Sequence, residues 1–331
     1  MPTMKKFRPG YLNLLADGEL KKRVQALNAL LADCTVCPRD CHVNRLNGKM
    51  GFCLAAEKPY VVSICDHHGE EPVLSGTNGS GTIFFGGCNL RCVFCQNYQI
   101  SQRPRYFRKF AITVRELAKH LLYLQNELQV HNINFVSPSH FVPQMVESIY
   151  LAALDGLNLP IVYNTNAYDA LPVLRLLEGI VDIYLPDFKY FDDAAAWQYS
   201  RVKNYVPVAR QAIKEMFRQV GLLKTDENGL AQKGLIIRHL ILPNHLAESE
   251  HILAWIAQEL SPQIAISLMS QYYPVHKAER FPLLNRKIRY AEYVRVTDVL
   301  QKWHMENGFV QEMEAPEYYL PDFEKEGHPF E

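Results

Sequence analysis

The sequence predicts an α/β fold in which six parallel strand–helix units form an open, partial TIM-like (β/α)6 barrel behind a Cys-rich extension. Apolar runs of strand length alternate with helical patterns from residue 82 to about residue 302. This alternation is typical of a parallel sheet whose crossovers are helices. The chain has 331 residues, 48% of them hydrophobic, so the composition is sufficient to fill a large core.

The clearest helix signal begins at Thr113. This residue is a good N-cap, and Glu116 completes a capping box three residues later. Leucines at 117, 121, 124 and 128 then repeat on one helical face. The remaining elements are expected as strands at 133–136, 161–164, 181–185, 235–242 and 264–268, and as helices at 142–154, 171–177, 192–222, 249–259 and 288–302.

We expect three parts along the chain. Residues 1–59 combine an N-terminal helix with a Cys-rich metal-binding segment, and residues 60–303 form the barrel after a lead-in strand at 60–64. Residues 304–331 are aromatic and acidic, and we expect this tail to pack on the barrel. Glu70 and Glu71 follow the lead-in strand in a stretch of turn residues. We interpret them as part of a solvated turn, with a position facing the active centre as the alternative.

The charge balance limits the classes of partner. Lysine plus arginine and aspartate plus glutamate each number 35, which argues against a nucleic-acid partner. No apolar run reaches about 18 residues and no signal peptide is visible, so we expect no membrane span and a cytoplasmic protein. Eight cysteines in such a chain indicate metal or redox chemistry rather than disulfides.

Three of these cysteines follow a short apolar run and two glycines. Cys88, Cys92 and Cys95 are spaced C-x3-C-x2-C within the stretch TIFFGGCNLRCVFCQNYQIS. Thiolates are the usual ligands of iron–sulfur centres. Three ligands on a four-iron cluster leave one iron open, as a catalytic metal requires. A zinc knuckle is the alternative, although zinc sites favour four ligands.

A C-x3-C-x-aromatic-C loop after a strand and two glycines resembles the cluster loop of radical S-adenosylmethionine (SAM) enzymes, with Phe94 as the aromatic residue. The segment GCNLRCVFCQN is similar to the corresponding segment in the branch related to pyruvate formate-lyase activating proteins. The resemblance implies a barrel of radical SAM type, a 4Fe–4S cluster on the three cysteines and SAM chelated to the open iron. In that family, reductive cleavage of SAM gives methionine and a 5′-deoxyadenosyl radical that abstracts hydrogen. It also implies an electron donor such as flavodoxin or ferredoxin.

The resemblance extends to the strand ends, where barrels of this kind carry their chemistry. After the second strand, family members commonly have a Gly-Gly-Glu run that holds the SAM amino group. This chain departs from it, which leaves that contact to Ser137, Ser139, His140 or the backbone. The next two strand ends resemble the DTN and LDxK motifs of glycyl-radical activases. The SAM-binding residues that this similarity implies are Asn164, Thr165, Asp187 and Lys189.

Two further residues complete the expected SAM pocket. Arg238 matches the arginine of an IRYVVVPG-like strand that projects toward the SAM methionine in the activases. Its planar fork binds a carboxylate through two hydrogen bonds. Gln271, after the last strand, is expected at the SAM ribose.

A second cysteine group precedes the barrel. Four thiols within twenty residues can complete a closed coordination shell, which favours a structural site. Zinc and an auxiliary iron–sulfur cluster both fit these ligands, and unligated reduced thiols are the remaining alternative. His42 is able to replace one thiolate. The four cysteines are Cys34, Cys37, Cys41 and Cys53.

Three functions are compatible with these features. The first is an activase that installs a glycyl radical on a partner enzyme. The second is a radical SAM enzyme that modifies a small molecule or a peptide. The third is a non-enzymatic metal-binding protein. The residues do not identify the substrate, because fold analogy alone does not specify one.

Overall fold

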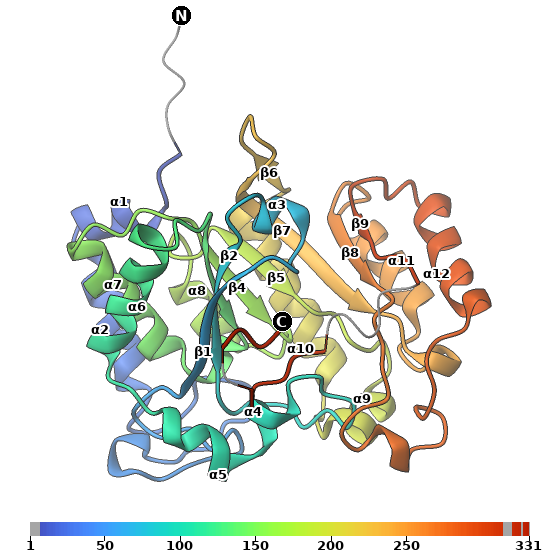
Figure 1. Cartoon of the computed structure of the whole chain (residues 1–331), viewed down its shortest axis with the longest axis horizontal. Helices are drawn as coiled ribbons and strands as arrows, with labels where there is room; N and C mark the ends of the chain where they lie inside the picture. Colours follow the sequence, from blue (N-terminus) through green and yellow to red (C-terminus); the bar gives the residue numbers. More distant parts are fainter. Residues whose placement is uncertain (1–6, 314–319, 326, 331) are drawn as a thin grey trace, which may run out of the picture.

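The computed structural model describes residues 7–313, 320–325 and 327–330. In this part of the chain, nine strands form a curved sheet in the order β1-β2-β3-β4-β5-β7-β8-β9, and β6 pairs with the start of β7 (Figure 1). The strands are β1 (Val61–His67), β2 (Ser80–Phe85), β3 (Ile133–Val136), β4 (Ile161–Thr165), β5 (Ile183–Pro186), β6 (Lys224–Thr225), β7 (Ala231–Leu240), β8 (Ala265–Met269) and β9 (Gly308–Val310).

The sheet confirms the predicted partial barrel. β2, β3, β4, β5, β7 and β8 pair in parallel in chain order, so their carboxyl ends meet at one rim. β1 extends one edge as an antiparallel strand, and β9 extends the other in parallel. Within the described residues these two edges do not pair with each other, and the barrel is therefore open between them.

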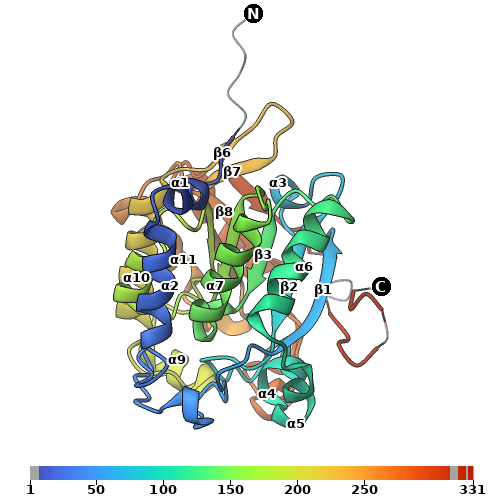
Figure 2. The same ribbon diagram turned by 90° about the vertical axis from the view of Figure 1, so that its left-hand side faces the viewer.

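Helices cover the outer face of the curved sheet. α2, α7 and α6 lie side by side over β2 and β3 (Figure 2), whereas α10 packs on β5 and β7. The helices are α1 (Tyr11–Ala16), α2 (Glu19–Ala29), α3 (Pro72–Ser75), α4 (Tyr98–Gln102), α5 (Pro104–Phe107), α6 (Val114–Asn126), α7 (Val142–Leu154), α8 (Leu171–Leu176), α9 (Asp193–Ser200), α10 (Tyr205–Val220), α11 (Ser249–Glu259) and α12 (Tyr290–Lys302).

The capping box predicted for α6 is confirmed. Thr113 Oγ1 accepts the Glu116 backbone N–H at 3.2 Å, and the Glu116 carboxylate accepts the Thr113 N–H at 2.7 Å. The expected helical insertion at 192–222 consists of two helices, α9 and α10. They are separate because Arg201 and Asn204 adopt left-handed conformations, with φ of 54° and 53°, which interrupt the helical path.

The N-terminal helices are attached to the outside of the barrel. The Asp182 carboxylate, before β5, accepts the backbone N–H groups of Gly10 at 3.1 Å and of Ile161 at 3.0 Å. Arg23 of α2 donates to the carbonyl of Leu176 at 3.0 Å. The segment before α1 and the first residue of β4 are therefore connected through one buried carboxylate.

The C-terminal segment lies against the opposite edge of the sheet from β9. Phe323 packs on Phe84 of β2 with ring centroids 5.1 Å apart, and Phe330 lies 4.1 Å from the ring of His67 on β1. The part of the predicted tail at 314–319, 326 and 331 lies outside the described residues. In the described part of the chain, no helix combines the length and the apolar character that crossing a membrane requires.

We expect Asp182→Ala to reduce stability by about 2–4 kcal/mol, because two buried N–H groups lose their acceptor and each unsatisfied group costs roughly 1–3 kcal/mol. The measurement is urea unfolding at pH 8. Asp155→Ala, at an exposed position on the same outer surface, is the control and should change stability by less than about 0.5 kcal/mol. Equal effects of the two substitutions would contradict this role of Asp182.

Candidate functional site

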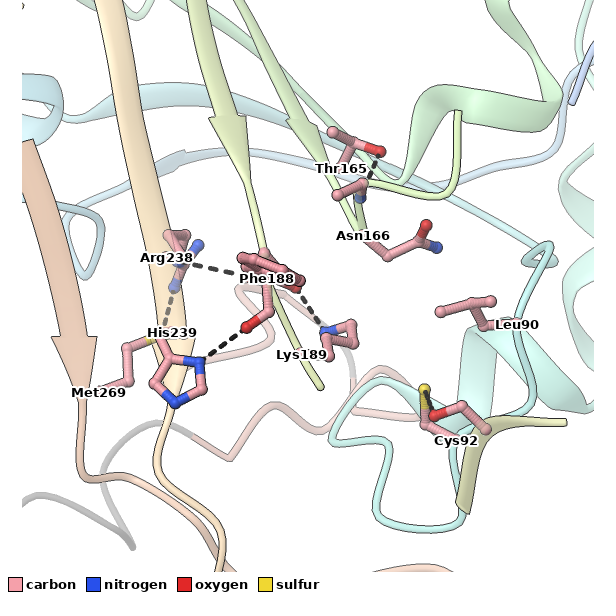
Figure 3. Close-up of polar contacts among 12 residues, drawn as sticks. Leu90, Cys92, Thr165, Asn166, Phe188, Lys189, Arg238, His239 and Met269 are labelled. Carbon is pink, nitrogen blue, oxygen red and sulfur yellow. Dashed lines mark hydrogen bonds and ion pairs between the residues drawn. The ribbon is translucent and has the colours of Figure 1, made fainter. Parts of the chain in front are cut away.

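One cavity opens at the rim where the strand ends meet. It is lined by the three cysteines of the loop after β2, which we call the cluster-loop cysteines (Cys88, Cys92 and Cys95). Figure 3 shows Asn166, Lys189 and Arg238 on the side of the strand ends that faces Cys92. The residues expected from the sequence that also line this cavity are Phe94, Ser137, Asn164, Thr165, Asp187, Lys189, Arg238 and Gln271.

The loop that carries these cysteines needs glycine where it leaves β2. Gly87 has φ of +84°, and a Cβ there would lie 2.6 Å from the carbonyl oxygen of Cys53. Any side chain would therefore combine an unfavourable backbone conformation with a clash against main chain that has no freedom to move aside. The tight passage places Cys88 directly at the mouth of the barrel.

Each cluster-loop thiol has a hydrogen-bond partner that suits a thiolate. The Leu90 N–H donates to Cys88 Sγ at 3.3 Å, and the Ser200 hydroxyl donates to Cys92 Sγ at 3.0 Å. Ser101 Oγ lies 3.3 Å from Cys95 Sγ. Burial raises the pKa of all three thiols, that of Cys95 to about 12, so they stay protonated at neutral pH until a metal displaces the protons.

The donor set fits a 4Fe–4S cluster better than a single ion. Three soft sulfurs line one cavity, and thiolates are the ligands that iron–sulfur clusters use. Within the described residues, no three His, Cys, Asp or Glu side chains lie close enough to hold one metal ion. A 4Fe–4S cluster can be held by three thiolates, whereas the alternative, a zinc knuckle, favours four ligands.

The strand ends opposite the cysteines are held by buried hydrogen bonds. Lys189 Nζ lies 2.6 Å from Asp187 Oδ2, and the Tyr205 hydroxyl donates to the Asp187 carbonyl at 2.9 Å. His239 Nδ1–H donates to the Phe188 carbonyl at 2.7 Å (Figure 3), and its Nε2 accepts from the Ser249 hydroxyl at 2.8 Å. These contacts fix the turn after β5 that presents Asp187 and Lys189 to the cavity.

Arg238 is surrounded by carboxylates. Its Nη1 lies 3.2 Å from Glu70 Oε2, its Nε lies 3.4 Å from Glu71 Oε1, and the same Nε lies 4.0 Å from Asp187 Oδ1. Although burial disfavours its charge, Glu71 and Glu70 raise the pKa of the guanidinium. Burial raises the pKa of Glu70 to about 7 against the opposing effect of Arg238. The remaining nitrogen, Nη2, contacts the Met269 sulfur at 3.2 Å.

The interpretation of Glu70 and Glu71 as a solvated turn is wrong. Their side chains are 6% and 4% exposed, and Glu70 lines the cavity and accepts a hydrogen bond from Asn134 Nδ2 at 3.1 Å. The loop after β1 turns into the barrel and pairs Glu70 with Arg238, 168 residues away in the chain. The signal available in the sequence was two adjacent acids with no basic residue beside them.

Two of the residues expected at SAM lie elsewhere. Ser137 has φ of 54° and starts a short 3₁₀ turn, Pro138–His140, that carries the next residues behind β3. Ser139 Oγ lies 3.1 Å from Thr165 Oγ1 in a buried network. His140 is 1% exposed, its Nε2–H donates to the Gly86 carbonyl at 2.9 Å, and it does not line the cavity.

His140 instead lines a second, largely enclosed cavity next to the first loop. His42 points away from this cavity, with Nδ1 3.0 Å from the Asp33 carboxylate at an exposed position. The four cysteines that precede the barrel all line it, and we call them the N-terminal cysteine site: Cys34, Cys37, Cys41 and Cys53.

His239 should make the protein sensitive to acid. Burial lowers its pKa to about 4, while in the unfolded chain it titrates near about 6.5. The unfolded state binds more protons between these values, so acidification costs stability. We expect the stability difference between wild type and His239→Gln to shrink by about 2–3 kcal/mol from pH 7 to pH 4.5.

Urea unfolding across that pH range measures this difference. The comparison with His239→Gln is needed because Glu70 and Asp182, whose pKa values burial raises to about 7, change stability in the opposite direction. A difference that stays constant with pH would show that His239 titrates normally in the folded protein.

The sequence is similar to known proteins. The radical SAM superfamily profile covers residues 82–224. The uncharacterized protein MJ0674 of Methanocaldococcus jannaschii is 33% identical over 294 residues, which span 87% of this chain and 80% of that protein.

Solved structures are more distant. SuiB of Streptococcus suis has a TM-score of 0.44 at 14% identity, over 73% of this chain and 52% of that one. A radical SAM methyltransferase from Sphaerobacter thermophilus has a TM-score of 0.44 at 15% identity, over 70% and 66%. The chain thus spans about half the length of SuiB.

The superfamily match begins at β2 and includes the cluster-loop cysteines and the strand ends that face them. The chain therefore belongs to the radical SAM superfamily, whose enzymes use a 4Fe–4S cluster together with S-adenosylmethionine.

Proposed function

We propose that the cluster-loop cysteines hold the 4Fe–4S cluster, that SAM occupies the cavity beside them, and that the substrate is a small molecule or a short peptide. When bound, the reduced cluster supplies the electron that cleaves SAM to methionine and a 5′-deoxyadenosyl radical, which abstracts hydrogen from the substrate. The observation that carries the proposal is the convergence of three hydrogen-bonded thiols and the strand-end polar groups on one cavity.

The residues of this cavity have separate tasks in the proposal. Ser137, Asn164, Thr165 and Gln271 offer hydroxyl and amide groups for hydrogen bonds to SAM. Phe94 contributes an apolar wall that excludes water. An electron donor of the flavodoxin or ferredoxin class is required to reduce the cluster.

The charges that line the cavity suggest which protein group binds each charged group of SAM. Glu70 and Asp187 are the carboxylates that line this cavity in the described part of the chain, so we assign them to the positively charged ammonium and sulfonium groups. Arg238 Nη2 makes no ion pair among the described contacts, and we assign it to the SAM carboxylate. Glu70 thus takes over the task that the Gly-Gly-Glu run performs in the related activases.

The C-terminal segment supports a substrate of limited size. Pro321 and Phe330 line the cavity beside Phe84 of β2, and Phe323 packs on the same strand. This segment occupies part of the mouth that a large partner protein would need to approach.

The similarity of the β4 and β5 ends to glycyl-radical activases favours the activase alternative.

We expect Cys92→Ala to reduce 5′-deoxyadenosine formation to the level of an enzyme-free control, because the cluster loses one of its three thiolate ligands. The measurement is product formation after anaerobic reconstitution with iron and sulfide, with dithionite and SAM added. Cys65→Ala, which removes a buried cysteine outside both groups, should retain activity. Undiminished product from Cys92→Ala, or none from wild type, would defeat the proposal. A glycine EPR doublet on an added partner protein would select the activase alternative.

We expect Glu70→Gln to weaken SAM binding at least about tenfold, the cost of roughly 1.4 kcal/mol for a lost charged contact. Glu71→Gln is the matched control, because Glu71 also faces Arg238 but does not line the SAM cavity. Its SAM affinity should change less than about threefold. Anaerobic equilibrium binding measures both variants, and equal effects would remove Glu70 from the SAM site.

A further inference from the structure

The N-terminal cysteine site is built as a ligand site. Its four cysteines line one cavity and none of them forms a disulfide. Gly51 closes one wall, where a Cβ would lie 2.6 Å from Cys41 Sγ. The Phe52 N–H points at the same sulfur from 3.5 Å. Backbone packed this closely on a sulfur, with an N–H directed at it, suits a metal-bound thiolate.

The four thiolates are candidate ligands for either a zinc ion or an iron–sulfur cluster. Zinc binds thiolates at about 2.3 Å in a tetrahedron, which puts the sulfurs within roughly 4 Å of one another. Within the described residues, no three candidate ligands meet the requirement for one ion. The cluster-loop cysteines likewise form no single-ion group among the described residues, and the superfamily to which the chain belongs places a 4Fe–4S cluster on such a loop.

The order of the cysteines favours the same group. Zinc sites usually combine two C-x2-C pairs, whereas this site has three close cysteines, C-x2-C-x3-C, and a distant fourth at residue 53. Three close cysteines with one remote cysteine is a ligand layout that iron–sulfur proteins use. The close trio is also the reverse of the C-x3-C-x2-C spacing in the cluster loop.

A buried arginine at the cavity requires negative charge. Arg45 is 1% exposed and lines the cavity, and its guanidinium donates to the carbonyls of Ala56 at 2.8 Å and His140 at 2.7 Å. Among the ion pairs that the structure describes, none includes Arg45. A buried cation without a counter-charge is costly, and four metal-bound thiolates supply that charge.

The site is also joined to the cluster loop. The Cys53 carbonyl packs against Gly87, and His140 bridges the two by lining the cavity while its Nε2–H donates to Gly86. Because that bond uses one ring nitrogen, Nδ1 is left buried and without a hydrogen-bond partner. Its lone pair marks an unfilled interaction at the wall of this cavity.

We propose that the N-terminal cysteine site holds a second iron–sulfur cluster, bound by all four thiolates, and not a zinc ion. With four protein ligands this cluster has no open iron and does not bind SAM. The proposal concerns a site separate from the SAM cavity, and it stands or falls independently of the proposed activity.

The test uses full-length protein reconstituted anaerobically with iron, sulfide and zinc all present. A variant with Cys88→Ala, Cys92→Ala and Cys95→Ala should keep about half of the wild-type iron and sulfide, because one of two clusters remains. It should contain less than one zinc per ten chains. One zinc per chain without sulfide, or loss of all metal from the correctly folded variant, would overturn the proposal.

A second measurement keeps the test decisive if the triple variant does not fold. Wild type reduced with dithionite should give two EPR signals, and addition of SAM should shift one of them and leave the other unchanged. Substituting Cys34→Ala and Cys37→Ala should remove the unshifted signal. Cys65→Ala is the control and should retain both signals. A single signal that shifts completely with SAM would refute the second cluster.

Discussion

The ion pair between Glu70 and Arg238 connects the two sides of an open sheet. Glu70 follows β1 at one edge, and Arg238 lies on β7, beyond the middle strands. The pair lines both the proposed SAM cavity and a third cavity, which is also lined by residues after β9, so it forms the partition between these two cavities. Buried ion pairs add little net stability, but removal of one partner is costly. The floor of the barrel is therefore specified by charge rather than by apolar packing alone.

Much of the fold could be predicted because it depends on local patterns. α7 and α11 have the predicted bounds, and the α6 capping box follows from two residues three positions apart. Alternation of strands with helices was sufficient to predict the parallel barrel. β9 was missed because it has only three residues, which is too short for a periodic signal.

The site could be predicted only where sequence position determines spatial position. Parallel strand ends necessarily converge, so Asn164, Asp187 and Arg238 were placed at one cavity correctly. That they contact SAM stays a prediction. His140 was misplaced because the left-handed Ser137 reverses the chain, and a non-glycine residue in that conformation has no reliable sequence signal. Glu70 was missed because its partner is distant in the chain.

Basic side chains lie close to both cysteine groups. Three arginines lie where the groups meet: Arg39 donates to the Asn89 carbonyl, Arg91 to the Cys88 carbonyl, and Arg45 to that of His140. Each bonds main-chain oxygen, and none is in a described ion pair. Arg45 is the buried one of the three. Carbonyl dipoles alone compensate a buried cation poorly, and the proposed metal–thiolate centre beside it would supply negative charge.

Glu70 and Asp187 lie at the strand ends that line the proposed SAM cavity, beside the basic groups of Arg238 and Lys189. This cavity therefore offers acidic groups for the ammonium and sulfonium of the proposed SAM and basic groups for its carboxylate. Charges of both signs at this cavity, with arginines beside the cysteine groups, would let this region hold the two proposed metal centres and SAM without leaving a buried charge uncompensated.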